Sequence, residues 1–140
     1  MNVTAINTAT VNATTRFLPF AGRLLIGGVF LMSGLSKLSA YTGTTAAISD
    51  AGLPFAPLGF AVAVIVEIGL GVLLLIGYRV RPVALGLAIW CLVTAMFFHH
   101  NFADQNTMIH FLKNLMIAGG LLQIVHFGAG AVSLDARSGR

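Results

Sequence analysis

Charged side chains are scarce in this sequence: 9% of its 140 residues are Asp, Glu, Lys or Arg, whereas 57% are hydrophobic. A soluble domain carries about 25% charged residues, so a chain this apolar lacks the polar groups needed to cover a surface in water. Its eight basic residues are dispersed one or two at a time, which argues against a nucleic-acid-binding face. The composition therefore predicts that lipid surrounds most of the chain.

Cysteine and recognised catalytic motifs are also sparse. Cys91 is the single cysteine, so neither an intramolecular disulfide nor a CxxC redox pair can form. The sequence has no glycine-rich phosphate loop, no paired catalytic carboxylates and no Ser/His/Asp order. The sequence therefore identifies no catalytic residue and leaves open whether the protein is an enzyme.

The first residues lack the charge, short apolar run and small-residue cleavage site of a secretory signal. Residues 1–16 are instead rich in Thr and Asn, and they are predicted to form a flexible, polar, cytoplasmic tail. Residues 129–140 are predicted to form a short cytoplasmic tail at the other end.

What the sequence does contain is four long apolar runs, each close to the roughly 20 residues that a helix needs to cross a bilayer core. These runs cover residues 17–38, 56–77, 82–98 and 108–128. Loops at 39–55 and 99–107 and a tight turn at 78–81 connect them. The sequence therefore predicts an all-α, polytopic membrane protein whose domain, residues 17–128, is an antiparallel bundle of four transmembrane helices.

The basic residues near the helix ends predict how the bundle is oriented, because Lys and Arg accumulate on the cytoplasmic side. Five arginines fall on one side: Arg16, Arg79, Arg81, Arg137 and Arg140. Lys37 and Lys113 fall on the other. Both termini are therefore expected in the cytoplasm.

Two ionisable residues lie well inside the apolar runs, Arg23 in the first and Glu67 in the second. A charge at the bilayer centre costs about 2.5–3.5 kcal/mol on insertion scales, so neither should face lipid. A pair between Arg23 and Glu67 is expected. It would either fix the register of the two helices or form part of a proton-linked or ligand-binding site.

The first run places several of its residues on one helical face. Positions i, i+4, i+7, i+11 and i+14 form one stripe, occupied by Arg23, Gly27, Phe30, Gly34 and Lys37. Small residues allow membrane helices to approach closely. The stripe is therefore expected to face the bundle.

A polar cluster is expected where the outer ends of the helices meet. Its candidate ligand-binding residues are Lys37, His99, His100, Asp104, His110, Lys113 and Asn114. Solvation at the membrane interface and a head-group or small-molecule site both explain such a cluster. No metal site is expected, because zinc needs at least three converging ligands and the adjacent His99 and His100 cannot both point from one helical face.

Four segments together resemble the DoxX family of bacterial membrane proteins. They are RLLIGGVFLMSGLSKL at 23–38, EIGLGVLLLIGYRVRP at 67–82, HHNF at 99–102 and GAGAVSLDAR at 128–137. The resemblance implies four transmembrane helices in the bacterial inner membrane. The residues that match its motifs are Arg23, Gly34, Lys37, Glu67, Gly71, Ser133, Leu134 and Asp135, with Gly71 as a second-helix packing position.

The resemblance implies a link to redox chemistry, since some relatives are subunits of a thiosulfate:quinone oxidoreductase and others assemble with redox-stress proteins. This chain has no haem, flavin or iron–sulfur motif, so it is expected to use a bound quinone or a redox-enzyme partner subunit. The alternatives are a non-catalytic scaffold that anchors partner enzymes and, less favoured, a small transporter. A homo-oligomer is compatible with each of them.

Overall fold

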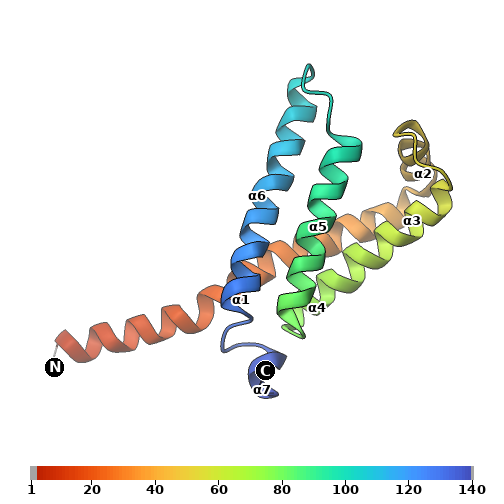
Figure 1. The fold of residues 1–140 in the computed structure, drawn as a ribbon. Coiled ribbons are helices and arrows are strands. Elements are labelled where there is room, and N and C mark those ends of the chain that lie inside the picture. Colours follow the sequence, from red (N-terminus) through yellow and green to blue (C-terminus); the bar gives the residue numbers. More distant parts are fainter. Residues whose placement is uncertain (1–2, 140) are drawn as a thin grey trace.

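The molecule consists of two antiparallel helical hairpins that cross each other at an angle (Figure 1). The computed structural model describes the backbone of residues 3–139 and the side chains of residues 15–139. In the first hairpin α1 (Val3–Ser39) packs on a second span made of α3 (Ala56–Val64), the π-helical segment η1 (Ile65–Leu70) and α4 (Gly71–Ile76). In the second hairpin α5 (Val80–Phe98) packs on α6 (Gln105–Phe127).

Four helices within the described residues are long and apolar enough to cross a membrane. These spans are Thr15–Ser39, Ala56–Ile76, Val80–Phe98 and Gln105–Phe127, each within three residues of the bounds expected from the sequence. The described chain is entirely helix, turn and loop, which confirms the all-α membrane fold. Arg140, one of the arginines used for orientation, lies outside the described residues.

The surface of the bundle carries many large apolar side chains. Leu25 and Met32 are 72% and 71% exposed, as suits side chains that face lipid. The buried positions of α5 are mostly small or branched residues: Val80, Val83, Ala84, Leu87, Ala88, Cys91 and Ala95. Small residues at helix contacts are typical of membrane bundles, where close packing replaces the hydrophobic effect between helices.

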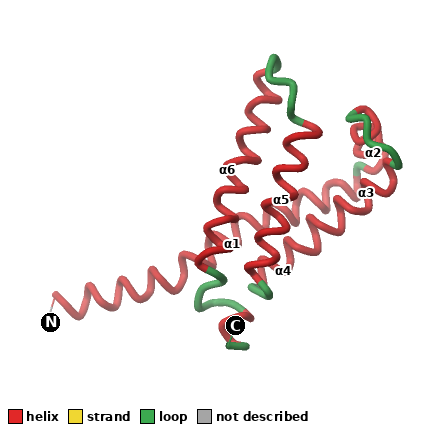
Figure 2. The backbone as a smooth tube through the Cα atoms, in the orientation of Figure 1, coloured by secondary structure: helices red, strands yellow, loops and turns green. Residues whose placement is uncertain are grey.

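The structure differs from the sequence prediction in the segments between and beyond the spans (Figure 2). The predicted 39–55 loop contains the helix α2 (Tyr41–Asp50), because Ile48 is buried and the Tyr41 ring packs edge-on against Phe60 at 4.8 Å. The residues of the predicted N-terminal tail belong to α1 from Val3 onward, and the flexibility of this tail stays a prediction. No Gly or Pro interrupts residues 3–18, so the helix of the first span continues through them.

The segment after α6 folds back and closes one end of the bundle. Arg23, 1% exposed, donates hydrogen bonds to the carbonyl oxygens of Leu74, Leu75 and Val132. Asp135, at the start of α7 (Leu134–Arg137), accepts hydrogen bonds at 2.8 Å from the backbone N–H groups of Arg79 and Val80. These bonds tie the C-terminal segment to α1, α4 and α5.

Glycines set the close approach of α1 to the second span. A Cβ added to Gly27 would lie 3.1 Å from the carbonyl oxygen of Gly71, and one added to Gly34 would lie 2.6 Å from a side-chain carbon of Ile68. The buried stripe of α1 therefore packs directly on η1 and α4.

Replacing Gly34 by Ala should push α1 away from η1. We expect the free energy of unfolding to fall by about 1–3 kcal/mol, the usual cost of overpacking a core. Gly28→Ala is the matched control, because its Cβ would meet nothing within 4 Å and the gain in helix propensity is the same. Thermal unfolding in detergent measures both. Equal stabilities for the two variants would contradict the close contact.

Candidate functional site

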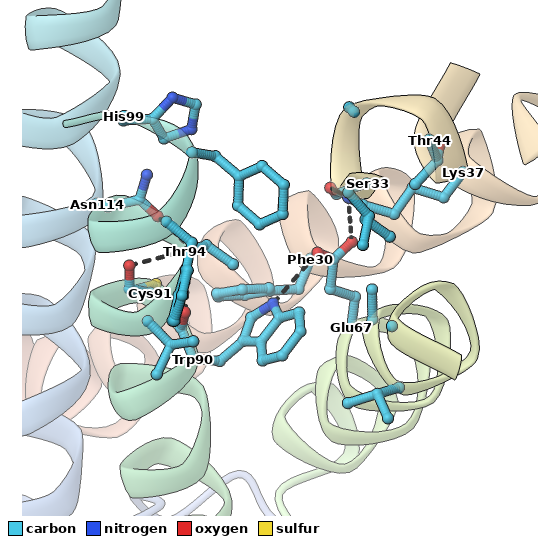
Figure 3. Close-up of a pocket in the computed structure, with 18 of the residues that line it drawn as sticks. Phe30, Ser33, Lys37, Thr44, Glu67, Trp90, Cys91, Thr94, His99 and Asn114 are labelled. Atoms are coloured by element: carbon cyan, nitrogen blue, oxygen red, sulfur yellow. Dashed lines mark hydrogen bonds and ion pairs between the residues drawn. The ribbon is translucent and has the colours of Figure 1, made fainter. Parts of the chain in front are cut away.

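A cavity of about 1140 Å³ lies between the two hairpins and is partly covered by α2. Most of its lining is apolar, and its polar lining side chains are Ser33, Lys37, Thr44, Glu67, Trp90, Thr94, His99 and Asn114. Figure 3 shows Lys37 and Glu67 on one side of it and His99 and Asn114 on the other, with Trp90 and Thr94 of α5 between them. The cavity is therefore an apolar space with two separate polar regions.

The first polar region is an ion pair held in a hydrogen-bonded group. Lys37 Nζ donates to Glu67 Oε2 at 2.8 Å and to Ser33 Oγ at 3.0 Å, and Trp90 Nε1 donates to Glu67 Oε1 at 3.2 Å. The side chains of Lys37 and Glu67 are 26% and 6% exposed. Each carboxylate oxygen thus has one donor, and the charge of the nearly buried carboxylate is neutralised.

The predicted pair between Arg23 and Glu67 is not formed. Gly34 lies against Ile68 and Glu67, whereas Arg23 lies beside Gly77. Gly77 is ten residues past Glu67, roughly 15 Å further along the second span. Lys37 is one turn beyond Gly34 on the same stripe, so its ammonium group reaches Glu67 in place of the guanidinium group.

Glu67 lies in the π-helical turn η1, which the sequence did not predict. A π turn inserts one residue more than an α turn and is frequent at functional sites. It rotates the following residues relative to those before it, and here Glu67 meets both Lys37 of α1 and Trp90 of α5. The only sequence signal for this position was an acidic residue inside an apolar run.

The second polar region joins α5 and α6. The Thr94 hydroxyl lies 3.4 Å from Asn114 Oδ1, and the rings of His99 and His110 stack at 5.2 Å. Burial and the neighbouring His110 lower the pKa of His99 from its usual value of 6.5. At neutral pH His99 is therefore an uncharged ring with one donor and one acceptor nitrogen.

The structure brings together only part of the polar cluster expected at the outer ends. Lys37, His99 and Asn114 line the cavity, together with Ser33, Trp90 and Thr94, which were not among the candidates. The others lie outside the lining: His100, His110 and Lys113 are exposed, and Asp104 caps α6 by accepting from the N–H groups of Asn106 and Thr107. In the part of the chain that the structure describes, no three His, Cys, Asp or Glu side chains converge as metal ligands would.

Removing one charge of the Lys37–Glu67 pair should lower the free energy of unfolding more than removing both charges. Lys37→Met would leave the Glu67 carboxylate unneutralised, and we expect a loss of about 3 kcal/mol in the free energy of unfolding, the low end for a broken buried pair because Lys37 is partly exposed. Lys37→Met with Glu67→Gln should recover most of that loss.

Thermal unfolding of the two single variants and the double variant in detergent measures this coupling. Losses that simply add would show that the two side chains do not stabilise each other.

The sequence is similar to a known protein family and to two bacterial inner membrane proteins. The family model DoxX matches residues 18–100. The chain is 36% identical over 115 residues to inner membrane protein YqjF of Escherichia coli K12, covering 81% of this chain and 85% of the relative. It is 32% identical over 120 residues to inner membrane protein YphA of the same organism, covering 82% and 86%. No solved structure matches the chain significantly.

Proposed function

Because the chain belongs to the DoxX family, we propose that it is an inner-membrane protein whose cavity binds a lipophilic molecule of the quinone class, as the membrane subunit of a redox complex. The observation that carries this proposal is the Lys37–Glu67 pair inside a largely apolar cavity. Small-molecule sites are concave and mostly apolar, with a few polar groups that fix orientation.

The size and lining of the cavity suit a head group with an apolar tail. Its volume of about 1140 Å³ is slightly above the range of roughly 300–1,000 Å³ for ordinary ligand sites, which leaves room for a tail. Leu25, Ile26 and Val29 line the part of α1 that lies two to three turns away from Lys37. A hydrocarbon tail would lie along these side chains while the head group stays with the polar residues.

The charges of the site favour an uncharged head group. Lys37 and Glu67 neutralise each other and the pKa of His99 is lowered. An ionised ligand would add an unpaired charge to a space with little water, which is costly. The carbonyl oxygen of an uncharged head group adds no such charge.

Lys37 would hold such a carbonyl. Its ammonium group has three N–H donors, and two of them bond Glu67 and Ser33. The third would donate to the ligand oxygen, while Ser33 and Glu67, the latter held by Trp90, keep the ammonium group in place. When bound, a quinone supplies two-electron chemistry, and a partner subunit would deliver the electrons.

Two further expectations accompany the proposal. The arginine-rich end of the bundle would face the cytoplasm, so that the cavity lies nearer the opposite side. A homo-oligomer or a redox partner would cover part of the apolar surface of α1.

Trp90 is the single tryptophan of the chain and lines the cavity, so its fluorescence reports binding. Titrating the purified protein with a short-chain benzoquinone should quench Trp90 saturably. Losing a charge-assisted hydrogen bond costs about 1.5–3 kcal/mol, so the Lys37→Met, Glu67→Gln double variant should bind roughly 10-fold to 100-fold more weakly.

Lys113→Met is the control, because Lys113 is an exposed lysine outside the cavity. Solvent extraction of protein purified from its native membrane should also yield quinone in stoichiometric amount. Unsaturable quenching together with a quinone-free extract would reject the proposal. The scaffold alternative would be favoured by a different result. Wild type would then assemble with its partner without binding quinone, and variants of Lys37 and Glu67 would fail to assemble.

A further inference from the structure

The closed end of the bundle, where the C-terminal segment folds back, carries a basic surface. Arg79, Arg81 and Arg137 are exposed, and no hydrogen bond or ion pair within residues 15–139 holds their guanidinium groups. The acidic residue of this end, Asp135, is 9% exposed, and both of its carboxylate oxygens accept backbone N–H groups. The carboxylate is therefore directed at the backbone and leaves the arginine side chains without a partner.

The two ends of the molecule differ in charge. Among the described side chains, the closed end holds five arginines and one carboxylate: Arg16, Arg23, Arg79, Arg81, Arg137 and Asp135. The cavity end holds two lysines and three carboxylates: Lys37, Lys113, Asp50, Glu67 and Asp104. A strong positive potential is therefore confined to one side of the membrane.

Two of the arginines are fixed in position by the fold. Arg79 has the left-handed φ of 45° at the turn into α5, and its N–H is held by Asp135. The guanidinium group of Arg81 lies over Gly128 at the end of α6, where an added Cβ would be 3.5 Å from Nε. Arg79 and Arg81 thus lie at the start of α5, beside the end of α6.

We propose that Arg79 and Arg81, with Arg137 of α7 at the same end, bind the phosphate group of anionic phospholipids in the leaflet that this end faces. Guanidinium groups bind phosphate through paired, charge-assisted hydrogen bonds. The apolar surface begins within a turn of this end, where Phe127 and Leu18 are 75% and 62% exposed. A bound phospholipid would place its phosphate at the arginines and its acyl chains along that surface, which a soluble anion would not use.

The experiment measures which lipids stay with the protein. The full chain is reconstituted in an equal mixture of phosphatidylcholine and phosphatidylglycerol, extracted in mild detergent, and analysed by native mass spectrometry. Each basic residue near an anionic surface contributes about 1 kcal/mol, about fivefold in affinity. Wild type should retain phosphatidylglycerol preferentially, and Arg79→Gln with Arg81→Gln should lower that preference roughly 25-fold.

Two further variants make the result specific. Lys113→Gln removes an exposed charge from the opposite end and should leave the preference unchanged. Arg79→Lys with Arg81→Lys keeps the charges that orient the helices but loses the paired geometry, so its preference should be intermediate.

Equal retention of the two lipids by wild type, or an unchanged preference in the Arg79→Gln, Arg81→Gln variant, would overturn the proposal. Displacement of the lipid by millimolar inorganic phosphate would also overturn it, since the site would then recognise a free anion. Quinone binding in the cavity, followed by Trp90 fluorescence, is a separate readout, so either proposal can fail alone.

Discussion

The carboxylate of Glu67 must be neutralised inside an apolar bundle, and much of the architecture follows from this requirement. An unpaired charge at this depth would cost several kcal/mol. Lys37 reaches it at 2.8 Å because α1 approaches the second span closely at Gly27 and Gly34. The indole N–H of Trp90, on α5, donates to the other oxygen of the Glu67 carboxylate. Glu67 therefore connects three of the four spans.

The other intramembrane charge, Arg23, is accommodated in a different way. No carboxylate among the described residues forms an ion pair with it, and it donates to backbone carbonyls of α4 and of the C-terminal segment. Gly77, with a φ of 75°, leaves room for the guanidinium group and for Ser133. The two hairpins are therefore joined firmly at the closed end by Arg23 and Asp135. At the opposite end they separate, and the cavity occupies the space between them.

The sequence predicted the parts of this structure that depend on long-range patterns. The apolar runs gave the four spans, because crossing a bilayer requires length and low charge, which are visible in the sequence. The helical spacing on α1 placed Arg23, Gly27, Gly34 and Lys37 on the stripe that is buried. Lys37, His99 and Asn114, which the sequence named as candidate ligand-binding residues, line one cavity; that they bind a ligand stays a prediction.

The features that the sequence did not predict depend on how neighbouring helices are positioned relative to one another, within a few ångströms. Arg23 was the wrong prediction for the partner of Glu67, because the register of two antiparallel helices cannot be determined from their separate periodicities. The π turn around Glu67 was missed because it has no residue signature of its own. The helix α2 was missed because its Thr- and Gly-containing segment has a weak helical pattern, and packing of Ile48 and Tyr41 on α3 stabilises it.

The distribution of charge also separates the two kinds of molecule that the protein is proposed to bind. Inside the cavity the Lys37–Glu67 pair is electrically neutral, so an anionic lipid entering it would bring an uncompensated charge into an apolar space. At the closed end the arginines have no acidic partner among the described side chains, so an anionic head group is favoured there and a neutral one gains little. Selectivity between uncharged and anionic lipids would then depend on which groups the carboxylates bond. Glu67 neutralises a lysine in the cavity, whereas Asp135 bonds the backbone and leaves its neighbouring arginines charged.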